Sequence, residues 1–161
     1  MAKKACCRHF CFVSGALFLL APLAQMLGLI QIVFPDGEWA SLAPVATLFG
    51  GSQTIVSEGN SYSFVFELNP FYIVLLSLSF IASLASLFGL DCRRNLIFSL
   101  IAGFFALLFS AFSLLSFHWV NPGFALDGIR GGTGFVLCIC TFIIAIAFLI
   151  PSLVTTKGKR K

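Results

Sequence analysis

The sequence predicts an all-α membrane protein: a bundle of four transmembrane helices with both termini in the cytoplasm and a small β-hairpin in the first extracytoplasmic loop. Three observations support this fold class. Of the 161 residues, 59% are hydrophobic and 10% are charged, whereas about 25% of the residues of a typical soluble domain are charged. Four apolar runs are long enough to cross a bilayer, and nearly all basic residues lie on one side of them. The length leaves room for a single domain, residues 1–161.

The four apolar runs predict helices over residues 10–34, 71–90, 96–120 and 131–154. A helix needs about 20 apolar residues to cross a hydrocarbon core about 30 Å thick, and each run is long enough. The first run follows basic residues, as a signal peptide would. It exceeds the usual apolar segment of about 7–15 residues, however, and no A-x-A cleavage site closes it. We therefore expect a retained helix.

The positions of lysine and arginine predict the orientation, because cytoplasmic tails and loops carry an excess of these residues. Nine of the ten lie in the two tails and in the connection between the second and third helices. Arg130 alone lies on the opposite side. We therefore expect cytoplasmic termini in a multi-pass protein of the plasma membrane. Basic residues at helix ends are typical of topology signals and lipid-headgroup contacts, so no nucleic-acid partner is expected.

The first outer loop, residues 35–70, contains a predicted β-hairpin at residues 53–68. Along its second strand, Tyr62, Phe64, Phe66 and Leu68 point one way, and Ser61, Ser63, Val65 and Glu67 point the other. This alternation of β-prone residues predicts a strand. The turn is expected at Glu58-Gly59-Asn60, with residues 54–56 as the partner strand.

The two faces of the hairpin have different expected roles. The aromatic face needs a cover: the outer ends of the helices, a third strand from residues 45–49, or a partner protein. The polar face is the candidate interaction surface, and it comprises Ser61, Ser63, Glu67 and Glu58. The hairpin is interpreted either as a lid packed on its own helices or as an edge that a partner strand extends. These two interpretations are compatible, since one edge can pack while the other stays open.

Small residues at three- and four-residue spacing predict where helices pack. The most continuous seam lies in the third helix and consists of Ser99, Gly103, Ala106, Ser110 and Ser113. In lipid, close backbone approach through small residues supplies the packing. We expect Gly103 of this seam to face the second helix.

Ionisable residues are missing from the interior of the predicted spans, where Gln25 and Gln31 are the strongest polar side chains. Intramembrane ionisable residues are typical of ion and proton pathways. A pump or a channel formed by one copy is therefore disfavoured. Either glutamine is expected to bond across helices.

Chemically reactive side chains give only weak signals. His118, Asp127 and Arg130 in the second outer loop are the weak candidates for outer-face chemistry, but no nucleophile motif such as G-x-S-x-G accompanies them. Asp127 and Arg130, three residues apart, are alternatively expected to pair or to cap the fourth helix. Cys6, Cys7 and Cys11 allow acylation, metal binding or no special role. We predict no catalytic site, no metal and no cofactor.

Four spans with both ends inside, and a long first outer loop with strands and Trp39, resemble the claudin-like tetraspan arrangement in topology. The resemblance implies a helix bundle that carries a small extracellular β-structure. The loop has Gly37-Glu38-Trp39 where claudins have Gly-Leu-Trp and paired cysteines, and the chain has no N-x-[ST] sequon. These departures suit a small protein of the bacterial cytoplasmic membrane.

The expected function is that of a small non-enzymatic integral membrane protein that acts through protein–protein interaction, for example as an accessory subunit of a larger membrane assembly. Its expected partners are the lipid bilayer and either another membrane protein or copies of itself. Two alternatives stay open. One is a transport or channel component that functions as an oligomer. The other is an outer-facing membrane enzyme that uses His118, Asp127 and Arg130.

Overall fold

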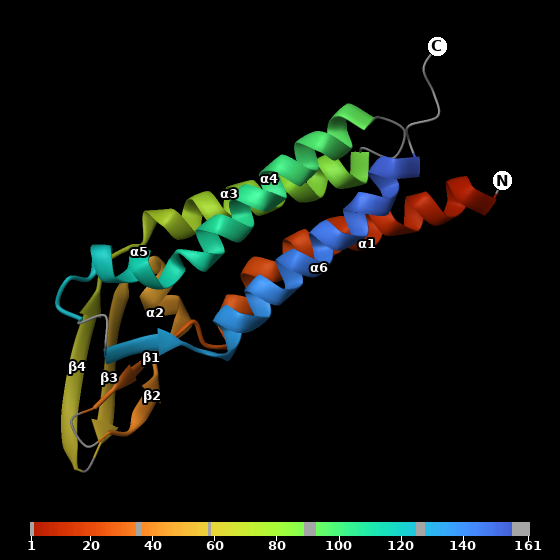
Figure 1. Cartoon of the computed structure of the whole chain (residues 1–161). Helices are drawn as coiled ribbons and strands as arrows, with labels where there is room; N and C mark the ends of the chain where they lie inside the picture. Colours follow the sequence, from red (N-terminus) through yellow and green to blue (C-terminus); the bar gives the residue numbers. More distant parts are fainter. Residues whose placement is uncertain (1, 35–36, 58, 89–92, 125–127, 156–161) are drawn as a thin grey trace.

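A helix bundle with two small sheets at one end makes up the protein (Figure 1). The computed structural model describes residues 2–34, 37–57, 59–88, 93–124 and 128–155. Within these ranges, four helices are long and apolar enough to cross a membrane, which confirms this part of the predicted architecture. We call the end that carries the sheets the sheet end. The opposite end, where the first helix begins and the last one ends, is the terminal end (Figure 1).

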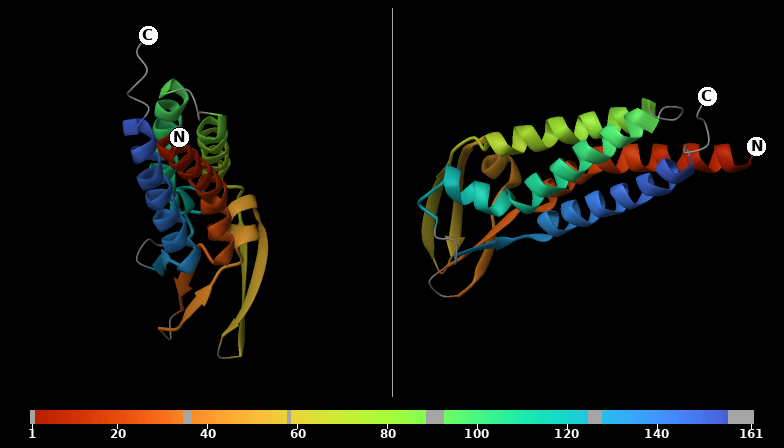
Figure 2. Two further views of the ribbon diagram at one scale, coloured as in Figure 1. Left: turned by 90° about the vertical axis from the view of Figure 1, so that its right-hand side faces the viewer. Right: turned by 45° about the horizontal axis from the view of Figure 1, so that its top comes forward.

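The four long helices form a closed ring of neighbours. They are α1 (Ala2–Ala24), α3 (Pro70–Phe88), α4 (Arg93–Ala111) and α6 (Thr133–Thr155). The candidate membrane spans are Arg8–Leu27, Pro70–Phe88, Arg93–Ala111 and Thr133–Val154. Helix α1 packs against α6 and α3, and α4 packs against α3 and α6 (Figure 2). Each helix therefore buries one face against two others.

Serine hydroxyls join neighbouring helices by donating to backbone carbonyls. These bonds run from Ser14 to Ala145 (2.8 Å), from Ser86 to Cys11 (2.8 Å) and from Ser99 to Ala82 (2.6 Å). A carbonyl that already accepts a helical hydrogen bond has a second lone pair for such a donor. The short side chains bridge the helices only because small residues let the backbones approach closely.

The first apolar run does not stay helical to residue 34, so that prediction is wrong at its C-terminal end. Helix α1 ends at Ala24, and the 3-10 helix η1 (Gln25–Leu27) follows it. Gly28 then takes a φ of 109°, which is outside the helical region and strongly favours glycine. Strand β1 (Ile30–Val33) continues the chain with residues that are mostly β-branched.

The third run, predicted as one helix over 96–120, is divided at Phe112 into α4 and α5 (Ser113–Val120). The hydroxyl of Ser116 donates to the carbonyl oxygen of Ser113 (2.9 Å) and accepts a hydrogen bond from Asn69 (3.2 Å). Such side-chain bonds compete with the regular helical ladder and bend helices. The break therefore occurs where the chain contacts the start of α3.

A three-stranded antiparallel sheet, which the sequence did not predict, joins the segment after α1 to the segment before α6. Its order is β2 (Trp39–Ser41), β1, β5 (Ile129–Gly131). Gln31 of β1 is the register partner of both Ser41 and Arg130. Because Gly131 belongs to β5, α6 begins at Thr133 and not at 131 as predicted.

The predicted hairpin is confirmed as β3 (Gly51–Ser57) and β4 (Asn60–Phe66). Ser57 pairs with Asn60 across a two-residue turn, and Gly59 has a φ of 79°. Residues 45–49, one proposed source of a third strand, belong instead to helix α2 (Pro44–Phe49), whose first residue is proline. Proline is well tolerated at that position because its missing N–H has no helical partner there.

Candidate interaction surface

The aromatic face of the hairpin is covered by the chain itself. Ring centroids lie 5.1 Å apart for Tyr62 and Phe34, 5.5 Å apart for Phe64 and Phe124, and 5.9 Å apart for Phe66 and Phe117. Phe117 belongs to α5, and Phe34 follows β1. Leu68 was predicted on this face but lies beyond the end of β4 and is exposed. Of the three covers considered, packing on the chain's own elements is the one observed.

The opposite face of the hairpin is exposed and uncharged along both strands. Val65 is 79% exposed and Val56 is 70% exposed. The outward side chains between them are Ser52 and Thr54 on β3 and Ser61 and Ser63 on β4. The hydroxyls of Thr54 and Ser63 lie 3.1 Å apart across the strands. This hydrogen bond holds a flat row of small side chains at the centre of the face.

The outer edge of β4 offers backbone groups as well as side chains. Residue pairs of an antiparallel hairpin alternate between hydrogen-bonded and non-hydrogen-bonded, and the Ser57–Asn60 pair closes the turn. By this alternation, Ser61, Ser63 and Val65 direct their N–H and C=O groups away from β3. The next residue whose backbone groups point the same way is Glu67, and its N–H donates to the Oδ1 atom of Asn121 (3.0 Å). Between the turn and Glu67, β4 has no second strand partner among the described residues.

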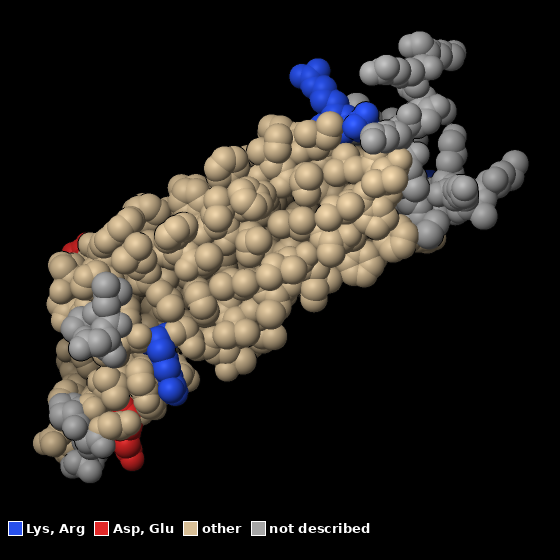
Figure 3. Space-filling model, in the orientation of Figure 1, with Lys and Arg blue, Asp and Glu red and all other residues tan. Residues whose placement is uncertain are grey.

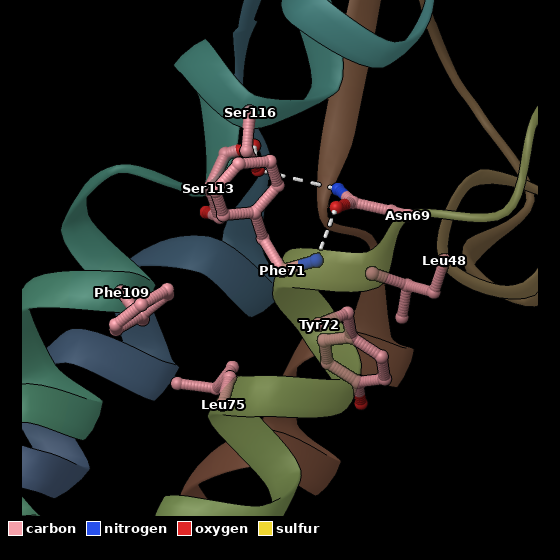
Figure 4. A pocket seen from close by; sticks show the side chains of 8 residues that line it. All are labelled: Leu48, Asn69, Phe71, Tyr72, Leu75, Phe109, Ser113 and Ser116. Atoms are coloured by element: carbon pink, nitrogen blue, oxygen red, sulfur yellow. Dashed lines mark hydrogen bonds between the residues drawn. The ribbon is translucent and has the colours of Figure 1, made fainter.

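Two asparagines fix the base of the hairpin to the helices. Asn121, at the end of α5, accepts from Glu67 and donates its own Nδ2–H to the carbonyl oxygen of Phe117 (3.2 Å). Asn69 donates to Ser116 (3.2 Å) and accepts from the N–H of Phe71 (3.1 Å) (Figure 4). Each asparagine is buried. The hairpin is therefore anchored at its helix-proximal end, and its turn extends away from the bundle (Figure 1).

A small cavity lies beside this anchor, between α2, α3 and the junction of α4 and α5. Its lining includes Asn69, Tyr72, Phe109 and Ser113 (Figure 4). Its volume is about 10 Å³, which is close to the minimum for one water molecule. Pockets for small-molecule ligands measure about 300–1,000 Å³. This cavity can hold no organic ligand.

The residues predicted for outer-face chemistry have separate structural roles. The Nδ1–H group of His118 donates to the carbonyl oxygen of Phe124 (2.6 Å), which fixes the imidazole against the loop after α5. Arg130 lies on β5 and contacts residues of β1 and β2. No hydrogen bond joins His118 to Arg130 among the described residues. Asp127 lies outside them, as does Glu58 of the predicted interaction surface.

The predicted seam is buried along its whole length: Ser99, Gly103, Ala106 and Ser110 lie on α4, and Ser113 is the first residue of α5. Gly103 faces α1 and not the second helix, so that expectation was wrong. A Cβ atom placed on Gly103 would lie 2.5 Å from the ring of Phe18. The seam still serves two other neighbours, because Ser99 bonds to α3 and the hydroxyl of Ser110 donates to the Sγ atom of Cys138 in α6 (3.1 Å).

In the described part of the chain, neither glutamine of the first run forms the predicted hydrogen bond between helices. Gln25 is fully buried in η1, and among the described residues its side-chain amide has no hydrogen-bond partner. Gln31 is not in a helix: it lies in β1, accepts from Arg130 (2.8 Å) and donates to Ser41 (3.2 Å). Gln31 therefore bonds across strands, not helices.

Of the N-terminal cysteines, Cys11 is buried in α1, and the side chains of Cys6 and Cys7 lie outside the described residues. Among the described residues, no group of three or more His, Cys, Asp or Glu side chains is placed to hold a metal ion.

One cluster at the sheet end was missed by the sequence analysis. The guanidinium carbon of Arg130 lies 3.8 Å from the ring centroid of Trp39, and Gln31 and Ser41 complete the cluster. One sequence pattern could have revealed it. Residues Ile30-Gln31-Ile32-Val33 alternate as a strand does, if they are considered separately from the apolar run before them.

No protein-family model, curated protein or solved structure matches this chain.

Proposed function

We propose that the chain is a non-enzymatic integral membrane protein that acts by binding another membrane protein through the outward face and the free edge of β4. The observation that carries the proposal is the contrast between the two faces of one hairpin. Phe66 is 3% exposed against aromatic rings of the same chain, whereas Val65 beside it is 79% exposed. The covered face fixes the hairpin in place, and the open face remains available to a partner.

The orientation in the membrane is part of this proposal. Both termini and the α3–α4 connection lie in the cytoplasm, and the two sheets lie outside. Support comes from the charge distribution. Nine of the ten lysine and arginine residues lie in the two tails and in the α3–α4 connection. The face drawn in Figure 3 shows basic side chains at the terminal end, then a belt without charge, and both acidic and basic side chains at the sheet end. Basic residues mark the cytoplasmic side of membrane proteins. The membrane is the plasma membrane, and the composition of the loops fits a bacterial one.

Strand addition is the binding mode that the edge favours. A partner strand gains backbone hydrogen bonds along Ser61, Ser63 and Val65, and each such bond contributes about 0.5–1.5 kcal/mol net. Soluble proteins usually protect an exposed edge with lysine, proline or a bulge. Neither lysine nor proline occurs in β4.

A proline scan of the two edges tests the proposal. Ser63→Pro removes an N–H that points away from β3, so the hairpin ladder stays intact while a partner strand loses a donor and meets the ring. Thr54→Pro is the matched control. Thr54 pairs with Ser63, and its N–H points away from β4 at the opposite edge of the hairpin. Chains cross-linked to the protein in intact membranes are quantified by mass spectrometry for both variants and the wild type.

The expected result is loss of one defined partner in Ser63→Pro and retention of that partner in Thr54→Pro. Both variants should keep the wild-type unfolding temperature in detergent. Retention of every cross-linked chain at wild-type level in a folded Ser63→Pro variant would refute binding through this edge.

A further inference from the structure

Arg130 of β5 is held in one orientation by side chains from the other two strands of the β2-β1-β5 sheet. Ser41, Gln31 and Arg130 are register partners, so their side chains form one row across one face. Gln31 accepts from the Nε–H of Arg130 (2.8 Å) and donates to the hydroxyl of Ser41 (3.2 Å). The ring of Trp39 lies against the guanidinium at 3.8 Å. These contacts define the plane in which the guanidinium lies.

Among the described residues, no hydrogen bond uses the two terminal nitrogens of Arg130. The Nε–H group is used by Gln31 and the face of the guanidinium by Trp39. Among the described residues, no carboxylate forms an ion pair with Arg130, and the side chain is exposed. A planar guanidinium presents its remaining N–H groups as a fork that matches two oxygens of a phosphate or carboxylate.

The position of Arg130 along the chain places it beside the lipid headgroups. The candidate span of α6 begins at Thr133, three residues after Arg130. At about 3.3 Å per strand residue, the Cα atom of Arg130 lies roughly 10 Å beyond the start of the span. The headgroup layer is about 5–7 Å thick on each side of the hydrocarbon core, so Arg130 lies at the outer boundary of that layer. Trp39 is 38% exposed at the same place, as is typical of the interfacial aromatic belt.

We infer that Arg130, positioned by Gln31 and Trp39, binds the phosphodiester group of a phospholipid in the leaflet at the sheet end. Phosphate oxygens are the ligand chemistry that fits a fixed bidentate donor. Free phosphate has the same chemistry, but the neighbouring membrane supplies headgroup phosphates at high local concentration. The inference does not depend on a protein partner of the hairpin.

Trp39 provides a local reporter of this site. The chain contains two tryptophans, so Trp119→Phe leaves Trp39 as the single fluorophore. The purified full-length variant in detergent is titrated with phosphatidylglycerol brominated near the carbonyl end of its acyl chains. A diacylglycerol with the same brominated chains lacks the phosphate. The expected result is saturable quenching of Trp39 by the phospholipid, and only weak, non-saturating quenching by the diacylglycerol.

Substitutions at Arg130 separate a bidentate site from general attraction. Arg130→Gln should weaken the saturable quenching by about tenfold or more, the usual effect of losing charge-assisted hydrogen bonds. Arg130→Lys keeps the charge but not the fork, and should recover only part of the affinity. Arg94→Gln is the control, because Arg94 is an exposed arginine at the terminal end. It should leave the titration of Trp39 unchanged. Far-ultraviolet circular dichroism and the unfolding temperature confirm that each variant is folded.

Three results would overturn the inference. Equal quenching by the phospholipid and the diacylglycerol would show that the phosphate is not recognised. An unchanged titration in folded Arg130→Gln would show that another group binds it. Displacement of the phospholipid by an equal concentration of inorganic phosphate would identify a site for the free anion and not for a lipid.

Discussion

Gly103 shows how one residue decides the distance between two helices. The space that a side chain would fill is occupied by the ring of Phe18, which is fully buried in α1. Neither residue is polar, so the contact contributes through close packing alone. Removing the side chain at position 103 lets α4 approach an aromatic residue of α1, and the hydroxyls of the same seam then reach α3 and α6.

Gly103→Leu should therefore lower the free energy of unfolding by about 1–3 kcal/mol, the usual cost of overpacking a tight interface. The measurement is thermal unfolding in detergent. Ala147→Leu adds bulk at an exposed position of α6 and serves as the control, with an unchanged midpoint.

A double variant identifies the cause of this destabilisation. Phe18→Ala combined with Gly103→Leu should cost less than the sum of the two single changes, because the leucine fills the space that the phenylalanine ring leaves. Additive effects would mean that Gly103 does not face Phe18. A wild-type midpoint for Gly103→Leu alone would place the residue against lipid.

The hairpin shows what one element's local pattern can establish. Its alternation was readable from the sequence because the register of β3 and β4 is set by adjacent residues and a two-residue turn. The expected energetic roles of its two faces can now be assigned to contacts. Phe64 packs against Phe124, with ring centroids 5.5 Å apart. The side chain of Glu67 is exposed, and its backbone N–H donates to Asn121.

Phe64→Ser should loosen the hairpin, since burying a phenylalanine contributes about 1.5–3 kcal/mol and Phe64 is half-buried, which places it near the lower value. Limited proteolysis of the sheet end should cut this variant faster than the wild type. Glu67→Lys should resist the protease as the wild type does, because exposed charge changes alter stability by less than about 0.5 kcal/mol. Equal cleavage of the two variants would contradict the assigned roles of the two faces.

The elements that sequence reasoning missed depend on partners far along the chain. Strand β1 is short, and in the sequence its residues continue the apolar run of the first helix, so a periodicity search merges it with the span. It becomes a strand by pairing with β5, and Gln31 bonds with Arg130 from 99 positions away. The same distance explains why the setting of Arg130 was missed: Gln31 and Trp39, which folding brings to Arg130, are remote in the sequence, and Asp127, the neighbour that sequence proximity suggested, lies outside the described residues. The break at Phe112 likewise requires Asn69 of another element.

At the scale of the whole molecule, the even number of spans and the clustering of charge were predictable because the order of apolar and basic residues along the chain determines them. The structure agrees with this: α1 begins and α6 ends at the same end of the bundle (Figure 1). The side of the membrane on which that end lies is part of the proposed function and can be measured directly.

Membrane-impermeant maleimide should label Ser61→Cys in intact cells, because Ser61 is exposed on the proposed outer face. Asn95→Cys, near the start of α4, should be labelled only after the membrane is permeabilised. The wild type is the background control, since its six cysteines all lie outside the two outer loops. The reverse labelling pattern would place the sheets in the cytoplasm and remove the basis for an external partner.

The junction between the β2-β1-β5 sheet and the helices has a mechanical consequence. Strand β1 follows span 1 and β5 precedes span 4 with very short connections, and the junction is braced by bonds from the N–H of Gly132 to the oxygen of Leu29 (2.8 Å) and from the N–H of Gly134 to the oxygen of Gly28 (2.9 Å). The sheet is therefore rigidly connected to the α1–α6 pair. A partner that pulls on the exposed strands would transmit tension to this pair as shear, and Ser14 and Ala145 lie at the interface that must resist it.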